Sequence, residues 1–201
     1  TTYTVTVYDN CGTPAAIDSV IITVYETPNV YFNAETFKGC TSAEIQFYDL
    51  SSPNIISWTW NFGDIASGIN NTSELQNPIH FFESQGDYDI SLSVTSINGC
   101  TNSISHPSLV NIFPSPIAIF NANPQATTIS DPTVMFYDQS IGANSWLWDF
   151  GDINSGSNNY STYINPIHNF TDAGVYDVWL VVGNEYYCFD STVLKITIKD
   201  E

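Results

Sequence analysis

The 201-residue chain carries 3 Lys and Arg residues against 21 Asp and Glu residues, which gives a formal net charge of −18. Binding to nucleic-acid phosphates or to an anionic membrane surface needs clustered cations, so neither is an expected partner. Aromatic residues make up 14% of the sequence, enough for a core, but no apolar run approaches the roughly 18 residues of a membrane-spanning helix. We therefore expect no membrane insertion.

Residues 1–26 resemble the last part of the two longer units that follow them. Apolar and polar residues alternate along "TYTVTVYDN", as they do in a strand, and the whole segment resembles "DYDISLSVTSINGCTNSISHPSLVNIFPSP" with a shorter turn. We therefore expect residues 1–26 to be the C-terminal part of a further domain, and the chain to be a piece cut from something longer.

Residues 27–114 and 115–201 form an internal repeat of about 88 residues. "IQFYDLS" at 45–51 matches "VMFYDQS" at 134–140, and residues 62–82 match residues 150–170. This length suits one small β-sandwich per repeat and is too long for a solenoid unit. The prediction is an all-β chain with one sandwich per repeat.

Period-two patterns run through both repeats. Apolar residues alternate with polar ones over 88–94 and over 176–182, which predicts half-buried strands. Pro28 and Pro116 lie at the joints between units, where proline stiffens a short linker. Tandem sandwiches with such linkers are expected to form a semi-rigid rod.

The stretch "WTWNFGD" at 58–64 occurs again as "WLWDFGD" at 146–152. Both copies are followed by "NPIH" and then by a Gly-x-Tyr that opens an alternating strand. These motifs resemble the polycystic-kidney-disease (PKD) domain, an immunoglobulin-like β-sandwich, over essentially the whole chain. The resemblance implies that the rings of four residues form the cores of the two sandwiches: Trp60, Phe62, Trp148 and Phe150. Core packing explains why the stretch is repeated, whereas catalysis does not.

Many PKD domains continue with glycine after the Asp of this motif, whereas this chain has Ile65 and Ile153 and then a longer loop. That variant resembles the PKD modules of large Bacteroidetes surface and secreted proteins, including gliding-motility adhesins. The resemblance implies an extracellular or cell-surface location associated with the outer membrane. It also implies neighbouring PKD-like modules as partners, and contact with type IX secretion components through a downstream domain.

The expected function is that of a non-enzymatic spacer or stalk in such an adhesin. The G-x-S-x-G, H-E-x-x-H and P-loop motifs do not occur in the sequence. One alternative is a substrate-binding accessory of a secreted hydrolase, which would hold a polysaccharide or protein through aromatic faces such as those of Trp58, Trp146 and Trp179. Packing between modules is the other reading of these rings. A further alternative is a passenger of a secretion system.

Calcium is the candidate cofactor, because some PKD domains bind it near this turn. The candidate ligands are Asp64 and Asn71 in the first repeat and Asp152 and Asn159 in the second, because calcium takes oxygen ligands. Each loop offers one Asp, whereas a good calcium site usually has several carboxylates. The alternative is that each Asp accepts backbone N–H bonds that hold the turn. His80 and His168 are interpreted as packed side chains, since they lie on separate domains.

Cys11, Cys100 and Cys188 occupy equivalent positions in the three units, and Cys40 lies near the start of the first full repeat. We expect a Cys40–Cys100 disulfide, with Cys11 and Cys188 left without partners. The position that matches Cys40 in the second repeat falls around Thr128. A disulfide suits an extracellular protein, and four free thiols are the alternative.

"DSV" at 18–20 and "DST" at 190–192 match the Asp-Ser/Thr-apolar pattern of Bacteroidetes O-glycosylation. Ser19 and Ser191 are therefore candidate modification sites, although so short a pattern also arises by chance in a chain rich in Asp and Ser.

Overall fold

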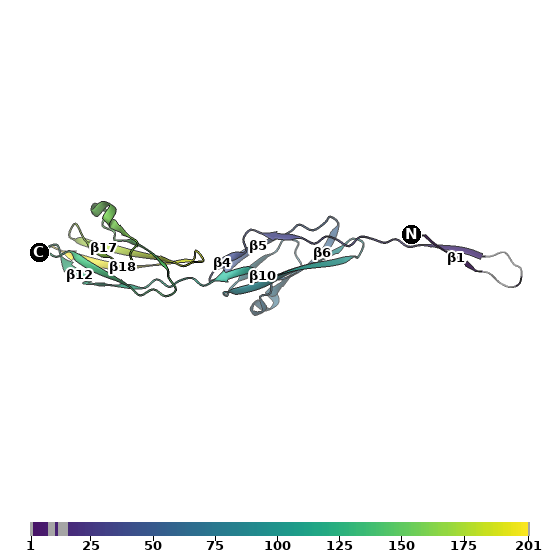
Figure 1. Cartoon of the computed structure of the whole chain (residues 1–201), viewed down its shortest axis with the longest axis horizontal. Helices are drawn as coiled ribbons and strands as arrows, with labels where there is room; N and C mark the ends of the chain where they lie inside the picture. Colours follow the sequence, from purple (N-terminus) through teal and green to yellow (C-terminus); the bar gives the residue numbers. More distant parts are fainter. Residues whose placement is uncertain (1, 8–10, 12–15, 201) are drawn as a thin grey trace. The chain divides into compact units, whose positions relative to one another are not determined.

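The structure is a computed structural model that describes residues 2–7, 11 and 16–200 (Figure 1). It is built almost entirely of β-strands, with two short 3-10 helices. The chain forms two compact units, one of residues 1–37, 44–81 and 88–110 and the other of residues 38–43, 82–87 and 111–201. No helix in the described part of the chain has the length and apolar character needed to span a membrane.

Residues at the N-terminal end of the described chain form an antiparallel hairpin. Strand β1 (Thr2–Val7) pairs with β2 (Ala16–Ile21), from Thr2 opposite Ile21 to Val7 opposite Ala16. The alternating stretch of residues 2–7 is therefore a strand, and residues 16–21 pair with it.

The first repeat is a sandwich of a five-stranded and a three-stranded sheet. An antiparallel ladder forms most of the five-stranded sheet, and its edge strand β4 pairs in parallel with the end of β10. The five-stranded order is β4 (Lys38–Cys40), β10 (Thr101–Phe113), β9 (Gly86–Ser96), β6 (Ile55–Asn61) and β7 (Thr72–Ser73). The three-stranded order is β3 (Phe32–Ala34), β5 (Ala43–Asp49) and β8 (Ile79–Phe82).

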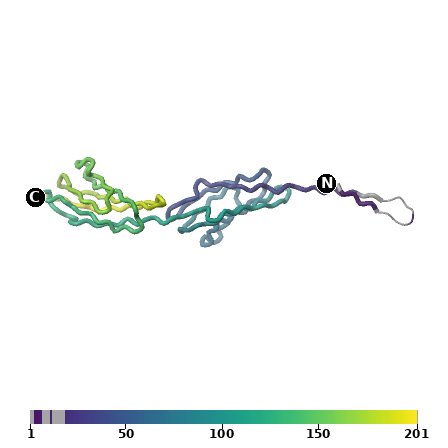
Figure 2. The backbone as a smooth tube through the Cα atoms, in the orientation of Figure 1, coloured from purple at the N-terminus to yellow at the C-terminus, as the bar shows by residue number. Residues whose placement is uncertain are grey.

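The second repeat has the same two sheets in the same strand order. Its longest pairing, β17 with β18, is visible in Figure 2 as the adjacent yellow-green and yellow segments near the C-terminus. The five-stranded order is β12 (Ala126–Thr128), β18 (Phe189–Lys199), β17 (Gly174–Gly183), β14 (Ser145–Asp149) and β15 (Tyr160–Ser161). The three-stranded order is β11 (Phe120–Asn123), β13 (Thr133–Asp138) and β16 (Ile167–Asn169).

One tryptophan occupies the centre of each sandwich. Trp60 and Trp148 are both 0% exposed. The Trp148 ring packs against Phe120 and Phe136 at centroid distances of 4.9 and 5.6 Å. Its indole N–H donates to the Tyr163 carbonyl at 2.9 Å, so the one polar atom of the ring is satisfied inside the core. Trp60 makes the corresponding bond to the Leu75 carbonyl, also at 2.9 Å.

The glycine of the repeated motif is required by a close backbone approach. Gly63 and Gly151 have φ values of 67° and 70°. A Cβ on Gly63 would lie 2.6 Å from the carbonyl oxygen of Asp89, and one on Gly151 would lie 2.8 Å from that of Asp177. The turn thus brings the chain against strand β9 or β17 at a position where only glycine fits.

The predicted Cys40–Cys100 disulfide is wrong. Cys40 is bonded to Cys188, with Cα atoms 5.7 Å apart, and Cys100 carries a free thiol. Cys100 directly precedes the 13-residue strand β10, whereas Cys40 pairs with the last residue of that strand, Phe113. At about 3.3 Å per residue the two cysteines lie at opposite ends of a strand roughly 40 Å long, far beyond the reach of a disulfide. Cys188, expected to lack a partner, is therefore the bonded one.

Candidate functional site

The motif turn of each repeat holds a buried carboxylate against a buried imidazole. Asp64 and Asp152 precede the 3-10 helices η1 (Ile65–Asn71) and η2 (Ile153–Asn159). Each accepts a hydrogen bond at 3.1 Å from the Nε2 atom of a histidine on the three-stranded sheet, His80 or His168. All four residues are less than 5% exposed. The pair therefore joins the turn after one sheet to a strand of the other.

A phenylalanine of the motif completes this arrangement. The Phe62 ring stacks on His80 at 4.3 Å, and the Phe150 ring stacks on His168 at 4.2 Å. Each imidazole is thus enclosed by an aromatic face and a carboxylate. The histidines are packed side chains, as interpreted from the sequence, but their Asp partners lie 16 residues away and were not identified there.

The electrostatics of the second pair assign its protonation state. Burial lowers the pKa of the His168 imidazole below its usual value, against the opposing effect of the hydrogen bond that the imidazole makes to Asp152. Burial also acts to raise the pKa of Asp152, but hydrogen bonds from Thr171 and His168 outweigh it and hold that pKa below its usual value. The pair is consequently a neutral imidazole that donates its Nε2–H to an ionised carboxylate. Burial likewise lowers the pKa of His80.

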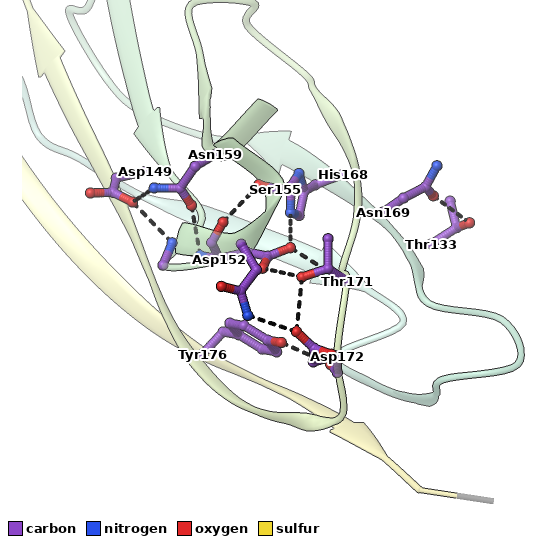
Figure 3. A network of polar contacts seen from close by, with 12 residues as sticks. Thr133, Asp149, Asp152, Ser155, Asn159, His168, Asn169, Thr171, Asp172 and Tyr176 are labelled. Atoms are coloured by element: carbon purple, nitrogen blue, oxygen red, sulfur yellow. Dashed lines mark hydrogen bonds and ion pairs between the residues drawn. The ribbon is translucent and has the colours of Figure 1, made fainter. Parts of the chain in front are cut away.

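The second repeat surrounds its pair with further hydrogen bonds (Figure 3). The Asp152 carboxylate accepts bonds from the backbone N–H of Thr171 at 3.0 Å and from its hydroxyl at 2.6 Å. The Asn159 amide accepts the Asp152 N–H at 2.6 Å and donates to the Asp149 carboxylate at 2.8 Å. These bonds close the 3-10 loop onto the strand from which it starts.

This geometry does not fit a calcium cage, the candidate weighed from the sequence against an Asp that holds the turn. In the second repeat the carboxylate of Asp152 and the amide oxygen of Asn159 both face protein N–H and O–H donors. In the first repeat, Asp64 faces His80, and the Asn71 Oδ1 atom is buried without a partner. Within the described residues, no group of three His, Cys, Asp or Glu side chains is placed to hold a metal ion. The Asp residues serve to hold the fold, and they bond a neighbouring strand as well as the turn.

Neither pair has the exposure of a catalytic acid or base. The side chains of Asp152 and His168 are 2% and 3% exposed, so a substrate cannot reach either group. A neutral buried histidine that donates to a carboxylate and is stacked on a phenylalanine ties two sheets together. The structure therefore supports a structural role for the repeated residues.

An exposed apolar cluster on the second repeat is a better candidate for contact with other molecules. We define the Trp179 face as four outward-facing side chains on neighbouring strands of the five-stranded sheet, 44–56% exposed: Leu147, Tyr160, Trp179 and Val193. Trp179 is directly opposite Val193 on one side and Asp149 on the other, and Asp149 is opposite Tyr160. In the alternation over 176–182 Trp179 falls among the outward-facing positions, and its ring is 46% exposed.

The corresponding positions of the first repeat are all small and polar. They are Thr59, Thr72, Ser91 and Ser105. The same fold therefore forms with or without the apolar side chains, and core packing does not account for them.

The remaining candidate residues are scattered. Trp58 and Trp146 are half-buried, and the Trp58 indole N–H donates to Asp49 at 2.7 Å. Ser19 in β2 and Ser191 in β18 are exposed, and their O-glycosylation stays a prediction.

Comparison with known proteins gives matches over both repeats. The family model described as "PKD domain" matches residues 26–112 and 115–198. A microbial collagenase of Vibrio alginolyticus is 35% identical over 88 residues, which cover 42% of this chain and 10% of that protein. The chain thus spans about a tenth of the length of this curated relative.

Two of the solved structures that match are single PKD domains of Vibrio proteins. The PKD1 domain from Vibrio cholerae metalloprotease PrtV is 28% identical, with a TM-score of 0.35, over 42% of this chain and 98% of that domain. The PKD1 domain of Vibrio anguillarum Epp is 24% identical, with a TM-score of 0.34, over 43% of this chain and 96% of that domain. Because the family model matches each of the two sandwiches over nearly its whole length, the chain belongs to the PKD domain family.

Proposed function

We propose that the chain is a non-catalytic spacer or stalk within a secreted or cell-surface bacterial protein. The observation that carries this proposal is where the repeated residues lie. Trp60 and Trp148, Phe62 and Phe150, and the two Asp–His pairs are all buried. These shared residues therefore serve folding, and their repetition supports a repeated structural unit.

A finer form of the proposal places this stalk in an outer-membrane-associated adhesin related to gliding motility and exported by type IX secretion. Its support is the resemblance of the loops after Asp64 and Asp152 to those of Bacteroidetes surface proteins. The net charge of −18 suits a soluble module that repels its neighbours. Sequencing the parent gene beyond Glu201, with mass spectrometry of the mature C-terminus, tests this form. A cleaved or anchored β-rich terminal domain supports it, and a catalytic domain there contradicts it.

The spacer proposal is tested by module replacement in the parent protein. Residues 27–201 are exchanged for two unrelated β-sandwich domains of similar size, and attachment of cells to a surface is measured. A spacer predicts that attachment survives, because only the distance and the number of modules matter. Loss of attachment with normal surface display of the protein would contradict the proposal.

The Trp179 face favours a second candidate, a substrate-binding accessory of a secreted hydrolase. Its four apolar side chains are not needed for the fold, because the first repeat forms the same sheet with Thr and Ser at these positions. A relative named microbial collagenase shows that a similar segment occurs in a larger hydrolase. Aromatic rings on an exposed sheet suit stacking against a polysaccharide or contact with an extended protein.

A binding assay separates the two candidates. The chain is mixed with insoluble polysaccharides and with fibrous protein, and the bound fraction is measured. The accessory candidate predicts retention that is lost in Trp179→Ser, whereas Ser91→Trp, the same exchange reversed in the first repeat, leaves the original retention in place. Failure of the unmodified chain to bind either polymer removes this candidate.

A further inference from the structure

The Cys40–Cys188 disulfide joins two consecutive repeats, and each cysteine lies at a defined place in its own repeat. Strand β4 pairs in parallel with the last residues of β10, which places Cys40 opposite Phe113. Cys188 closes the turn between β17 and β18, where the Asn184 N–H donates to its carbonyl at 3.0 Å. The Cys40–Cys188 bond therefore joins an edge strand of one repeat to the hairpin turn of the following repeat.

Cys100 lies at the same place in the preceding hairpin. It closes the turn between β9 and β10, where the Ser96 N–H donates to its carbonyl at 2.9 Å. The Cys100 Sγ atom lies 3.9 Å from the carbonyl oxygen of Tyr25. Tyr25 precedes Pro28 by three residues, as Phe113 precedes Pro116. The free thiol of Cys100 therefore lies next to Tyr25, and Tyr25 is the counterpart of Phe113, the residue opposite Cys40.

The strand that would bring a second sulfur to this position is the counterpart of β4. In the first repeat β4 covers Ile112, which pairs with Gly39 and is 3% exposed. The counterpart of Ile112 is Val24, which is 82% exposed, and residues 23–25 belong to no strand. An edge strand paired with residues 23–25 in the register of β4 would bury Val24 and place its third residue opposite Tyr25.

We propose that Cys100 is one half of a disulfide whose other half is a cysteine in the preceding PKD repeat, at the position equivalent to Cys40. The separation of Cys40 and Cys188 is 148 residues, which places this partner upstream of Thr1. The proposal rests on residues 1–26 being the end of such a repeat, and it is independent of whether the chain acts as a spacer or as a binding module.

The bond forms by thiol–disulfide exchange. The two thiols lose two protons and two electrons in total, and an external disulfide, of a small thiol or of an oxidoreductase, is reduced to two thiols. An extracellular compartment supplies such an oxidant.

The same register predicts where the series of bonds ends. In the second repeat the residue paired with Lys199, at the position equivalent to Cys40, is Thr128. A repeat that follows this chain therefore finds no sulfur on its predecessor at this position. The covalent ties run from the preceding repeat to the first and from the first to the second, and then stop.

Peptide mapping of the parent protein tests the proposal directly. Protein purified from its source is alkylated without reduction, digested and analysed by mass spectrometry. The expected result is that the Cys100 peptide is joined to a peptide from upstream of Thr1, while Cys40 is joined to Cys188. An alkylated Cys100 in protein that retains the Cys40–Cys188 bond would overturn the proposal.

A duplicated chain tests the geometry without the upstream sequence. Residues 1–26 are replaced by a second copy of residues 27–114, so that a Cys40 precedes Cys100 at the native spacing. The expected result is a new bond from the added Cys40 to Cys100, in addition to Cys40–Cys188, so that only the Cys100 of the added copy stays alkylatable in non-reduced protein. The matched control carries Cys40→Thr in the added copy only, and its original Cys100 stays alkylatable. Alkylation of the original Cys100 in the duplicated chain, with the Cys40–Cys188 bond intact, would show that the register does not bring the sulfurs together.

Discussion

The motif turns of the two repeats are nearly identical in sequence but differ in how completely their polar atoms are bonded. In the second repeat Thr171 gives Asp152 two bonds, and Asp149 accepts the Asn159 amide. The first repeat has Glu83 and Asn61 at the positions of Thr171 and Asp149. Its Asn71 keeps a buried amide oxygen without a partner.

This comparison separates what the fold requires from what each copy adds. Both turns keep the Gly, the buried Asp and the His, so these residues suffice for the architecture. The hydrogen bonds that differ come from Thr171 and Asp149, where the first repeat has Glu83 and Asn61. A buried polar atom without a partner costs free energy, so we expect the first repeat to be the less stable of the two at this turn.

The largest expected effect tests whether each sandwich has its own core. Trp148→Ala removes a fully buried ring and leaves the Tyr163 carbonyl without its donor, so we expect a loss of about 3–5 kcal/mol in the second repeat. Hydrogen exchange resolved by peptide measures it, and the first repeat should keep its protection. Trp60→Ala is the matched variant, with the loss in the first repeat. A Trp148→Ala protein with unchanged exchange in the second repeat would contradict a core role for this ring.

Gly151→Ala tests the close approach of the motif turn to β17. Positive φ and contact with the Asp177 carbonyl both oppose a Cβ, so we expect a loss of roughly 1–3 kcal/mol in the free energy of unfolding of the second repeat. Chemical denaturation measures it. Gly156→Ala is the control, because Gly156 has a φ of 62° but no neighbouring atom within 4 Å of the place that a Cβ would occupy. Equal losses in the two variants would mean that the approach to Asp177 contributes nothing.

Exchanging side chains between the repeats tests whether these hydrogen bonds account for the difference between the two motif turns. Thr171→Val removes the hydroxyl that Asp152 accepts, and we expect a loss of about 1–2 kcal/mol in the second repeat. Glu83→Thr supplies the same hydroxyl to the first repeat and is expected to stabilise it by about 1 kcal/mol. Both are measured by hydrogen exchange of the peptides that contain η1 and η2. A Glu83→Thr variant that loses stability would show that the two turns are not interchangeable.

Acid is expected to lower the free energy of unfolding of both repeats through the buried histidines. This loss is smallest near neutral pH and grows as the pH falls. Because the folded-state pKa of His80 and of His168 is lowered, each favours the folded state fully above its unfolded pKa of about 6.5. This stabilisation is lost as the pH falls below that value. The lowered pKa of Asp152 adds a second loss, in the second repeat, as the pH falls below about 3.8. Denaturation between pH 8 and pH 3 measures both, and a stability that rises below pH 6 would contradict the assigned protonation states.

The sequence was sufficient for the features that depend on periodicity. Alternation predicted β9 and β17, and the resemblance of the motif to the PKD domain predicted that Trp60 and Trp148 lie in the cores. The alternation over 176–182 also puts Trp179 on the outer side of its strand.

Contacts that depend on which strands are neighbours, and on which of their ends meet, could not be predicted from the alternation within each strand. Cys40 and Cys100 belong to one repeat, but the parallel pairing of β4 with the end of β10 separates them by the length of a strand. The Asp–His pairs join residues 16 positions apart across two sheets, and alternation within each strand carries no information on that contact. The matching positions of Cys11, Cys100 and Cys188 were the one available signal, because a cysteine that recurs in every hairpin points to a partner outside its own repeat.

The Cys40–Cys188 bond also determines which part of the chain carries a pulling force. Tension applied at the two ends of the polypeptide passes along the backbone to Cys40, crosses the two sulfur atoms and leaves through Cys188. Residues 41–187 hold the strands of both sandwiches except β3, β4 and β18, and they lie outside this load path. If they unfold, the chain does not lengthen until the bond is reduced. Reduction would then release up to roughly 500 Å of extended chain, at about 3.4 Å per residue.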